Sequence, residues 1–237
     1  MFRFVSKQEY WDIADSGILK DLPHKFDWHL KSIQDAIAYN FLNEQSNKTL
    51  AEVGGGNSRL LPVLATTNTC YNIEEFKGDG GGPKQEIEIE GVINVLTKVG
   101  HSSDKIRAEQ FDVIFSISVV EHVPNEQLPD FFEDCHRILK PSGLMIHLID
   151  VYLEDNLGDN SSSSERVLDY ASFLDGTLFT PVEPPAILSE KDIVFFTSFA
   201  TNPDNMMNHW NHVVPSLRKK RERAQSCTLL MAGCKSG

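Results

Sequence analysis

The segment from Thr49 to Ala65 constrains the fold of this chain more than any other part. Thr49 to Val53 is short and apolar, as in a buried strand, whereas Asn57 to Ala65 carries three leucines at helical spacing. Three glycines, Gly54 to Gly56, lie between the two. Glycine permits positive φ and lets a ligand approach the main chain without a Cβ atom in the way, and a helix start presents unpaired N–H groups. We therefore predict a strand–turn–helix unit whose backbone can hold a small polar ligand.

Further along the chain, apolar runs of strand length alternate with helical or polar segments. The predicted strands are Thr69–Ile73, Ile93–Val99, Phe111–Ile117, Leu144–Ile149, Ile193–Phe199 and Cys227–Gly233, and the predicted amphipathic helix is Leu128–Leu139, ending before Lys140. Alternation at this spacing is typical of βαβ units with right-handed crossovers, and such sheets bind ligands at the carboxyl ends of their strands. The expected fold is α/β, a doubly wound sheet with helices on both faces.

The two flanks of this region are expected to be accessory. Residues 1 to 48 carry an apolar stripe at helical spacing, from Phe26 to Phe41, and are predicted to form an N-terminal helical cap. Residues 49 to 237 are predicted to form one domain, because a chain of 237 residues is most simply one domain with an elaboration. From about 150 to 190 the composition changes to serines, acids and prolines, which indicates an insertion on the substrate side.

Charge and cysteine content exclude some classes of partner. The chain has 34 acidic and 22 basic side chains, a net charge of −12, which repels a phosphate backbone and argues against nucleic acid. The one basic cluster, 218–223, is interpreted as a solvated helix face. Four cysteines lie far apart without zinc-like spacing, so we expect free thiols in a reducing compartment. With no signal peptide or membrane span in the sequence, we expect a soluble cytoplasmic protein.

Two known patterns compete for the glycine turn. The dinucleotide fingerprint requires a Gly or Ala three residues after the second glycine of its pair, and Arg59 stands there if Gly54 and Gly56 are that pair. The alternative is the pattern acidic-x-Gly-x-Gly-x-Gly/Ser of methyltransferases that use S-adenosylmethionine (SAM). Glu52, Gly54, Gly56 and Ser58 match this second pattern at each position, and we favour it.

Two further blocks extend the likeness to methyltransferases. They are Phe111-Asp-Val-Ile-Phe-Ser-Ile-Ser-Val-Val-Glu-His-Val123 and Phe131-Phe-Glu-Asp-Cys-His-Arg-Ile-Leu-Lys-Pro-Ser-Gly143. With them, residues 49 to 150 resemble the class I SAM-dependent methyltransferases, in particular their small-molecule, type 11-like branch. The resemblance implies a Rossmann-like sheet of seven strands, mostly parallel, with the last strand antiparallel beside the sixth. It also implies SAM as the cofactor.

The resemblance assigns cofactor-binding roles to residues near the ends of the first two strands. Gly54, Gly55 and Gly56 would face the methionine part of SAM, with Glu52 near its amino group and Ser58 completing the motif. After the second strand an acidic residue would accept hydrogen bonds from both ribose hydroxyls. That residue is Glu74, or Glu75 if the strand register is shifted by one.

The loops after the third and fourth strands complete the implied cofactor site. Family members often carry an acid beside the adenine amino group, but here the place falls to His101, with Ser102, Ser103 or Asp104 as alternatives. After the fourth strand, main-chain carbonyls would pass under the methionine part of the cofactor, contributed by Ser116, Ile117 and Ser118.

Glu121 and His122 are the candidate catalytic pair. Methyl transfer is an in-line displacement at a sulfonium, so positioning alone can supply about 7 kcal/mol or more in favourable cases. For a hydroxyl or protonated amine acceptor, His122 could remove a proton near neutral pH, since its unperturbed pKa is about 6.5. The alternative is that the two residues only start the next helix.

The same region bears on metal binding. Related ubiquinone-pathway O-methyltransferases carry Glu-x-x-Glu-His here, a motif whose acids and histidine are associated with a divalent metal. This chain has Ser118 in place of the first acid, which leaves a poor set of groups for a hard cation. We therefore expect no required metal.

The acceptor pocket is expected from the parts without a family signature, the N-terminal helices and the 150–190 insertion. Aromatic side chains there could line a pocket for a planar or cationic substrate, although such side chains more often belong to the core. The candidates are Tyr10, Trp11, Trp28, Tyr152, Tyr170 and Trp210, and His147 and Asp150 near the end of the fifth strand could also face the acceptor.

The leading hypothesis is an enzyme that moves a methyl group from SAM to an O or N atom of a small-molecule metabolite and releases S-adenosylhomocysteine (SAH). The alternative is a SAM- or SAH-binding regulatory or scaffold protein without turnover. A nicotinamide dehydrogenase on the same architecture is disfavoured by Arg59 and by the Glu121-His122 block.

Overall fold

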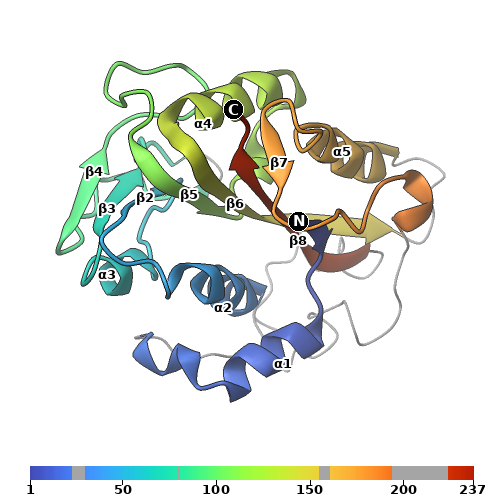
Figure 1. Ribbon diagram of the computed structural model, residues 1–237, viewed down its shortest axis with the longest axis horizontal. Helices are drawn as coiled ribbons and strands as arrows, with labels where there is room; N and C mark the ends of the chain where they lie inside the picture. Colours follow the sequence, from blue (N-terminus) through green and yellow to red (C-terminus); the bar gives the residue numbers. More distant parts are fainter. Residues whose placement is uncertain (23–29, 79–80, 155–160, 194–223) are drawn as a thin grey trace.

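The computed structural model describes residues 1–22, 30–78, 81–154, 161–193 and 224–237 (Figure 1). In this part of the chain one eight-stranded sheet runs in the order β1-β8-β6-β5-β2-β3-β4, and β7 pairs with β8 off this path. The strands are β1 (Phe2–Phe4), β2 (Thr49–Val53), β3 (Thr69–Ile73), β4 (Val92–Val95), β5 (Phe111–Ile117), β6 (Leu139–Glu154), β7 (Phe179–Pro181) and β8 (Ala224–Lys235).

The sheet has a parallel part and an antiparallel part. The strands from β4 through β3, β2 and β5 to β6 pair in parallel, whereas β8 runs antiparallel to β6, β1 and β7. The β6–β8 ladder is long, from Leu144 opposite Cys234 to Glu154 opposite Ala224. The predicted α/β class, mostly parallel with an antiparallel last strand, is confirmed.

Helices cover both faces of the sheet. In Figure 1, α1 (Lys7–Asp15), α2 (Leu30–Leu42) and α3 (Leu61–Leu64) lie below the sheet, and α4 (Leu128–Ile138) and α5 (Ser161–Ser172) lie above it. Successive strand residues point to opposite faces of the sheet. Met145 and Ile149 of β6 therefore pack in the core between the sheet and α4, whereas Ile146 and Leu148 pack in the core between the sheet and α2. The doubly wound arrangement places the loops after β2, β3, β4 and β5 at one edge.

Several elements differ from expectation, among them the last strand, which was expected at Cys227–Gly233 and spans Ala224–Lys235. Residues 1–48 contain the expected helices but also β1, which extends the sheet beyond β8 through the pairs Phe2–Met231 and Phe4–Leu229. The strand expected at Ile93–Val99 is only Val92–Val95, because the N–H of Thr97 turns back to the Val95 carbonyl at 2.8 Å. The fifth strand expected to end at Ile149 continues to Glu154, since β8 pairs with it along this whole length.

The helix expected at Asn57–Ala65 is the shortest element of its kind, only Leu61–Leu64. The reason lies in Ser58, whose hydroxyl accepts the N–H groups of Leu60 and Leu61 at 3.2 and 3.0 Å. Serine side chains compete in this way with the helical hydrogen-bond pattern. The glycine turn therefore opens into an extended loop before the helix begins.

Several expectations fall outside the described residues. They include nearly all of the strand at Ile193–Phe199, the basic cluster 218–223, Trp28 and Trp210. No helix in the described ranges is long and apolar enough to cross a membrane. All four cysteines are free thiols, as expected, and Cys70, Cys135 and Cys227 are buried.

Candidate active site

A cavity of about 760 Å³ lies where the loops after β2, β3, β4 and β5 meet. Most of the residues singled out from the sequence line it, namely Glu52, Gly54, Gly55, Gly56, Ser58, Glu74, Glu75, His101, Ile117, Ser118 and His122. Three do not, namely Ser102, Ser116 and Glu121. The sequence motifs therefore converge on one site, although segments up to 70 residues apart supply them.

The glycine turn is a backbone cradle with no room for side chains. Gly54 and Gly56 have positive φ, +67° and +53°. A Cβ atom on Gly54 would lie 2.6 Å from Val119, and one on Gly55 would lie 2.7 Å from the Asn72 Oδ1 and 3.0 Å from the Glu52 Cδ. Both the conformation and the close packing thus require glycine.

Glu52 lies beneath this turn with its carboxyl group almost fully buried. It is 5% exposed and accepts a hydrogen bond from the Ser58 hydroxyl. Burial raises its pKa to about 7, and the nearby Asp35 adds to the rise, whereas the Ser58 hydrogen bond and the cations of Arg59 and Lys31 oppose it. The carboxyl group is thus poised to ionise when a positive group enters the cavity.

Asn72 of β3 ties the turn to the sheet. Its Nδ2 donates to the Gly56 carbonyl at 2.9 Å. Its buried Oδ1 accepts no hydrogen bond from the described residues. Such an unpaired acceptor at the floor of a glycine cradle is consistent with a ligand that supplies polar hydrogens there.

Glu74 and Glu75 both border the cavity but differ in their partners. Glu75 forms ion pairs with Lys77 at 2.9 Å and Lys98 at 3.8 Å, whereas Glu74 accepts only the Phe76 N–H, at 3.0 Å, among the contacts described. Glu74 therefore has more free acceptor capacity for a diol. The glycine-rich loop that follows also reaches the cavity, with Pro83 only 3.1 Å from where a Gly56 Cβ would stand.

One part of the cavity lining is mostly apolar. Val99, Gly100, His101 and Phe131 form this part. The Gly100 N–H donates to the buried Asp134 of α4 at 2.8 Å, which fixes this loop against the helix. A planar ring could lie between Val99 and Phe131, with His101 at the solvent side.

Two residues expected near the cofactor point elsewhere. Ser102 is exposed, with a φ of +43°, and its loop turns it away from the cavity. Ser116 is buried on the opposite side of β5, where its hydroxyl lies 2.7 Å from the Nδ1 of His147. His147 is itself in the core, beside Phe131 and Phe132, and burial lowers its pKa to about 3, so it does not face an acceptor.

The acceptor end of the cavity is polar rather than aromatic. Its wall comes from α2, which contributes Lys31 and Asp35, and from Ser118 and His122. None of the described aromatic candidates borders the cavity, and Tyr10 and Tyr170 are buried in the core, the alternative place for such side chains. The signal missed was a polar stripe at i, i+3 and i+4, Lys31, Gln34 and Asp35, on an otherwise apolar helix.

An ion pair fastens α2 to the glycine turn. Arg59 donates to both oxygens of Asp35, at 2.5 and 2.8 Å, in the bidentate geometry that favours arginine. The Asp35 side chain is 2% exposed and that of Arg59 is 43% exposed. Arg59, which counted against the dinucleotide pattern in the sequence, thus stabilises the rim of the cavity.

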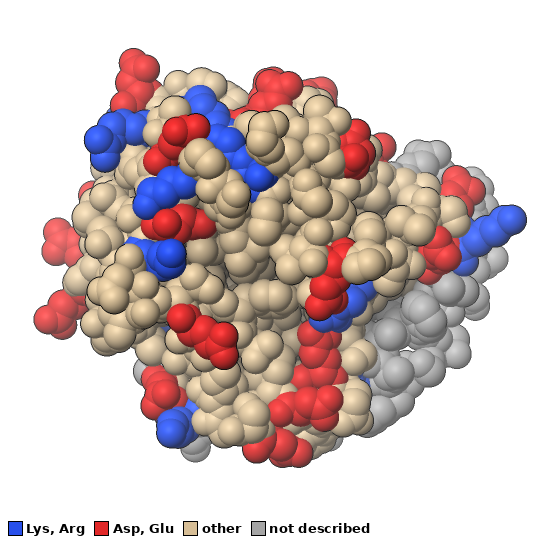
Figure 2. Space-filling model, viewed as in Figure 1, with Lys and Arg blue, Asp and Glu red and all other residues tan. Residues whose placement is uncertain are grey.

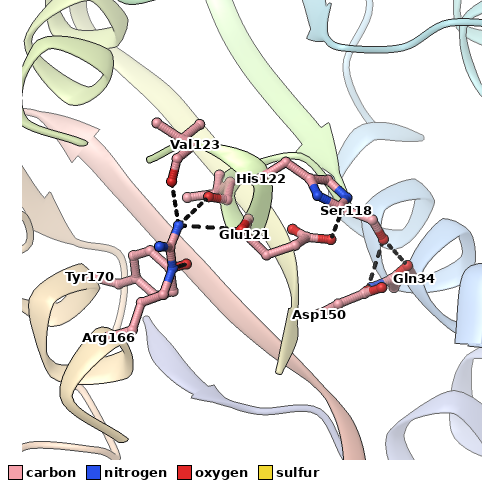
Figure 3. A network of polar contacts seen from close by, with 9 residues as sticks. Gln34, Ser118, Glu121, His122, Val123, Asp150, Arg166 and Tyr170 are labelled. Carbon is pink, nitrogen blue, oxygen red and sulfur yellow. Dashed lines mark hydrogen bonds and ion pairs between the residues drawn. The ribbon is translucent and has the colours of Figure 1, made fainter. Parts of the chain in front are cut away.

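The candidate catalytic residues lie on a single 3-10 turn, Val120–His122 (Figure 3). Arg166 of α5 holds this turn by donating to the carbonyls of Val120, Glu121 and Val123. His122 faces the cavity with its side chain 53% exposed, while Glu121 lies behind it at 15% exposure. His122 Nε2 and Glu121 Oε1 are 3.9 Å apart.

Behind Glu121 lies a polar network from three distant segments (Figure 3). Gln34 of α2 donates to Asp150 of β6 at 2.6 Å, and the Ser118 hydroxyl lies 2.8 Å from Asp150 and 2.9 Å from the Gln34 carbonyl oxygen. Ser118 has a φ of +54°, unusual for a residue with a side chain, which directs its hydroxyl to these partners. Asp150 lies within β6 rather than at a strand end.

The acid pair determines the protonation of this region. Burial and the charge of Asp150 raise the pKa of Glu121 to about 8, opposed by backbone N–H groups of Glu121 and Asp150 and by Lys31. Neither Glu121 oxygen accepts a hydrogen bond of normal geometry among the described residues. Burial lowers the pKa of His122, Asp150 raises it, and Lys31 and Arg166 lower it further. At neutral pH, Glu121 is thus largely neutral and His122 is a free base.

On one face of the molecule, charges of both signs lie side by side. Figure 2 shows Lys and Arg beside Asp and Glu across the face drawn there. In the described part of the chain, no group of three or more His, Cys, Asp or Glu residues could hold a metal ion. The expectation that no metal is required stays a prediction.

Comparisons with known proteins agree with this arrangement. The sequence model of the family described as "Methyltransferase domain" matches residues 51–147, which include the glycine turn and the Glu121-His122 turn. No curated protein sequence matches the chain.

Two solved structures are similar in fold. Geranyl diphosphate C-methyltransferase from Streptomyces coelicolor A3(2), in complex with Mg²⁺, geranyl diphosphate and SAH, has a TM-score of 0.54 and 13% identity over 95% of this chain and 97% of that chain. Phosphoethanolamine N-methyltransferase 2 from Haemonchus contortus, in complex with phosphomonomethylethanolamine and SAH, has a TM-score of 0.57 and 13% identity over 98% of this chain and 61% of that chain.

The fold is Rossmann-like, and residues 51–147 match the methyltransferase domain. The residues present suit SAM. The glycine turn leaves main-chain groups open to a ligand, and the buried Glu52 can pair with a positive group. Glu74 and Glu75, which follow β3, can accept hydrogen bonds. The fold of the chain is similar to those of methyltransferases solved with SAH.

Proposed function

We propose that this enzyme transfers the methyl group of SAM to an O or N atom of a small-molecule metabolite and releases SAH. The observation that carries the proposal is the cavity of about 760 Å³, which runs from the glycine cradle to His122. That volume is near the upper end for small-molecule sites, about 300–1,000 Å³, and leaves room for a small acceptor beside the cofactor. A neutral imidazole at the acceptor end suits an acceptor that loses a proton.

Within this proposal each cofactor group has a place. The methionine part lies on Gly54–Gly56, with Glu52 ionised against its amino group. The ribose hydroxyls bind Glu74, whose carboxylate has the freer acceptor positions. The adenine lies between Val99 and Phe131.

The relatives' acceptors support a small molecule over a nucleic acid. The two similar structures hold geranyl diphosphate and phosphomonomethylethanolamine, each a small molecule. The net charge of −12 also disfavours a phosphate backbone as substrate. We further propose the cytoplasm as the compartment, which four free thiols support.

Two measurements test the proposal in sequence. Calorimetric titration with SAM, SAH and NAD should give micromolar binding of the first two and none of NAD. The protein is then incubated with methyl-labelled SAM and a panel of phenols, alcohols and amines, and SAH formation is followed. His122→Asn should abolish transfer to the acceptor found while SAM affinity stays within about twofold. Tight SAM binding with no transfer to any acceptor in the panel, or to RNA tested beside it, would favour the regulatory alternative.

A further inference from the structure

The feature that the proposed function does not use is the partly buried acid pair behind His122, Glu121 and Asp150. Asp150 comes from β6 and Glu121 from the turn after β5, and neither borders the cavity. Burial of Glu121 and the charge of Asp150 both disfavour a second negative charge, so the pair tends to keep one proton. The surrounding contacts indicate which member keeps it.

The hydrogen bonds favour the charge on Asp150. Its Oδ1 is within 2.6 Å of the Gln34 Nε2 and 2.8 Å of the Ser118 hydroxyl, both of which can donate. Hydrogen bonds to a carboxylate stabilise its charged form. Glu121 has no such donors of normal geometry on either oxygen, so the proton belongs on Glu121.

The location of that proton matters for His122. An ionised Glu121 at 3.9 Å would stabilise the imidazolium form of His122, whereas a neutral Glu121 does not. No ion-pair contact joins His122 to Asp150 within the described part of the chain, so the charge on Asp150 acts on the imidazole from farther away. A protonated Glu121 therefore leaves His122 as a neutral base.

We propose that Asp150 is a positioning residue for methyl transfer. Held by Gln34 and Ser118, its carboxylate keeps a proton on Glu121, which leaves the His122 imidazole neutral and able to take a proton from the acceptor. The inference rests on the proposed function for the identity of that proton. It names Asp150, Gln34 and Ser118 as a unit that acts on His122 through Glu121, with Asp150 and Gln34 outside the cavity lining.

The step balances as a simple displacement. A lone pair of the acceptor O or N attacks the methyl carbon, the C–S bond breaks and its electron pair stays on sulfur, giving neutral SAH. The proton lost by the acceptor moves to the free nitrogen of His122. The positive charge of the sulfonium thereby passes to the imidazolium, which releases the proton to solvent through the open side of the cavity.

Other charged groups surround the pair and act on it in both variants. Lys31 faces it from α2, Arg166 and Tyr170 face it from α5, and His122 adjoins it on the same turn. Because these groups are unchanged when Asp150 or Glu121 is replaced, the two substitutions can be compared with each other. The two substitutions are predicted to change the titration midpoint of His122 by different amounts.

The test is an NMR titration of the full chain with labelled histidine, which requires no acceptor. The His122 signal is the one missing from His122→Asn. In the unmodified protein we expect His122 to titrate below pH 6.5, with a second, smaller shift near pH 8 as Glu121 ionises. Asp150→Asn keeps hydrogen-bonding groups for Gln34 and Ser118 but removes the charge.

Asp150→Asn should let Glu121 ionise at neutral pH and raise the His122 midpoint by about one pH unit. Glu121→Gln should leave the midpoint nearly unchanged and abolish the second shift near pH 8. The exposed Glu126→Gln, on the neighbouring turn, removes an acid without touching the network and should change neither.

Three results would overturn the inference. They are a His122 midpoint that falls or stays constant in Asp150→Asn, equal effects of Asp150→Asn and Glu121→Gln, or a second shift that survives in Glu121→Gln. If Asp150→Asn does not fold, as judged by circular dichroism, the Glu121→Gln result alone decides. Failure here leaves SAM binding intact, whereas failure of the proposed function appears as absent methyl transfer with His122 titrating as described.

Discussion

The cofactor end and the acceptor end of the cavity are built by different means. The cofactor end uses main chain from short, continuous segments, chiefly Gly54–Gly56 and the loop at Val99–His101. The acceptor end uses side chains from distant segments, since Gln34 and Ser118 are 84 residues apart and Gln34 and Asp150 are 116 apart. The cofactor end can therefore be recognised from a sequence motif, whereas the residues of the acceptor end come together only in the folded sheet.

If the cofactor end depends on bare backbone, adding side-chain volume there should have the largest effect. Gly55→Val would place a Cβ atom 2.7 Å from the Asn72 Oδ1, with two further methyl groups to accommodate. Overpacking of this kind costs about 1–3 kcal/mol or more. We expect SAM binding to fall below detection in calorimetry.

The matched control separates crowding from general destabilisation. Gly176 has a φ of +93° and no atom within 4 Å of an added Cβ, so Gly176→Ala strains the backbone without crowding the cofactor. Its melting temperature should fall while SAM affinity stays constant. If a folded Gly55→Val variant binds SAM with unchanged affinity, the glycine turn does not hold the cofactor through its bare backbone.

The ribose contact is expected to have the next largest effect. Glu74→Ala should weaken SAM binding by about 1.5–3 kcal/mol, the value of hydrogen bonds to a charged group, without unfolding the domain. Glu75→Ala is the comparison, because the Glu75 carboxylate already pairs with Lys77 and Lys98. A larger loss in Glu75→Ala would mean that the diol is held one residue later.

The cofactor end was accessible to sequence reasoning for a physical reason. A glycine turn between an apolar strand and a helix has few alternatives, so β2 was predicted at Thr49–Val53 and found there. The limits of that reasoning appear in α3, where Ser58 accepts two backbone N–H groups and delays the helix. A side-chain hydrogen bond of this kind leaves no periodic signal.

Ionisation of Glu52 gives a smaller, pH-dependent effect at the same end. Burial raises the pKa of Glu52 from 4.5 to about 7. The folded protein without SAM is therefore more stable when Glu52 is neutral than when it is ionised. That stability is fully present below about pH 4.5 and is lost as the pH rises through about 7. Bound SAM, which is cationic, favours the ionised form.

We therefore expect SAM affinity to rise by about tenfold between pH 6 and pH 8, as ionised Glu52 becomes available. Glu52→Gln should bind SAM more weakly at pH 8 and lose most of this dependence. Titration calorimetry at several pH values measures both. A pH dependence that persists unchanged in Glu52→Gln would assign it to another group.

The acceptor end resisted prediction because its parts have no local pattern. The aromatic residues of the N-terminal helices suggested a pocket, but Tyr10 is buried in the core with α2 packed beside it. The polar stripe Lys31, Gln34 and Asp35 reads as an ordinary helix face until β5 and β6 bring Ser118 and Asp150 against it. Asp150 was misplaced for a related reason, since only pairing with β8 carries β6 beyond Ile149.

The smallest effect on SAM binding is expected where the two ends are most separate. Gln34 is fully buried and lies outside the cavity lining, so Gln34→Ala should change SAM affinity by less than about twofold. The same substitution removes the hydrogen bonds to Asp150 and Ser118 and should lower the free energy of unfolding by about 1–3 kcal/mol. Calorimetry and denaturant unfolding measure the two quantities on one sample. A loss of SAM affinity as large as that of Glu74→Ala would show that α2 supports the cofactor end as well, and the separation between the ends would then hold for their sequence patterns only.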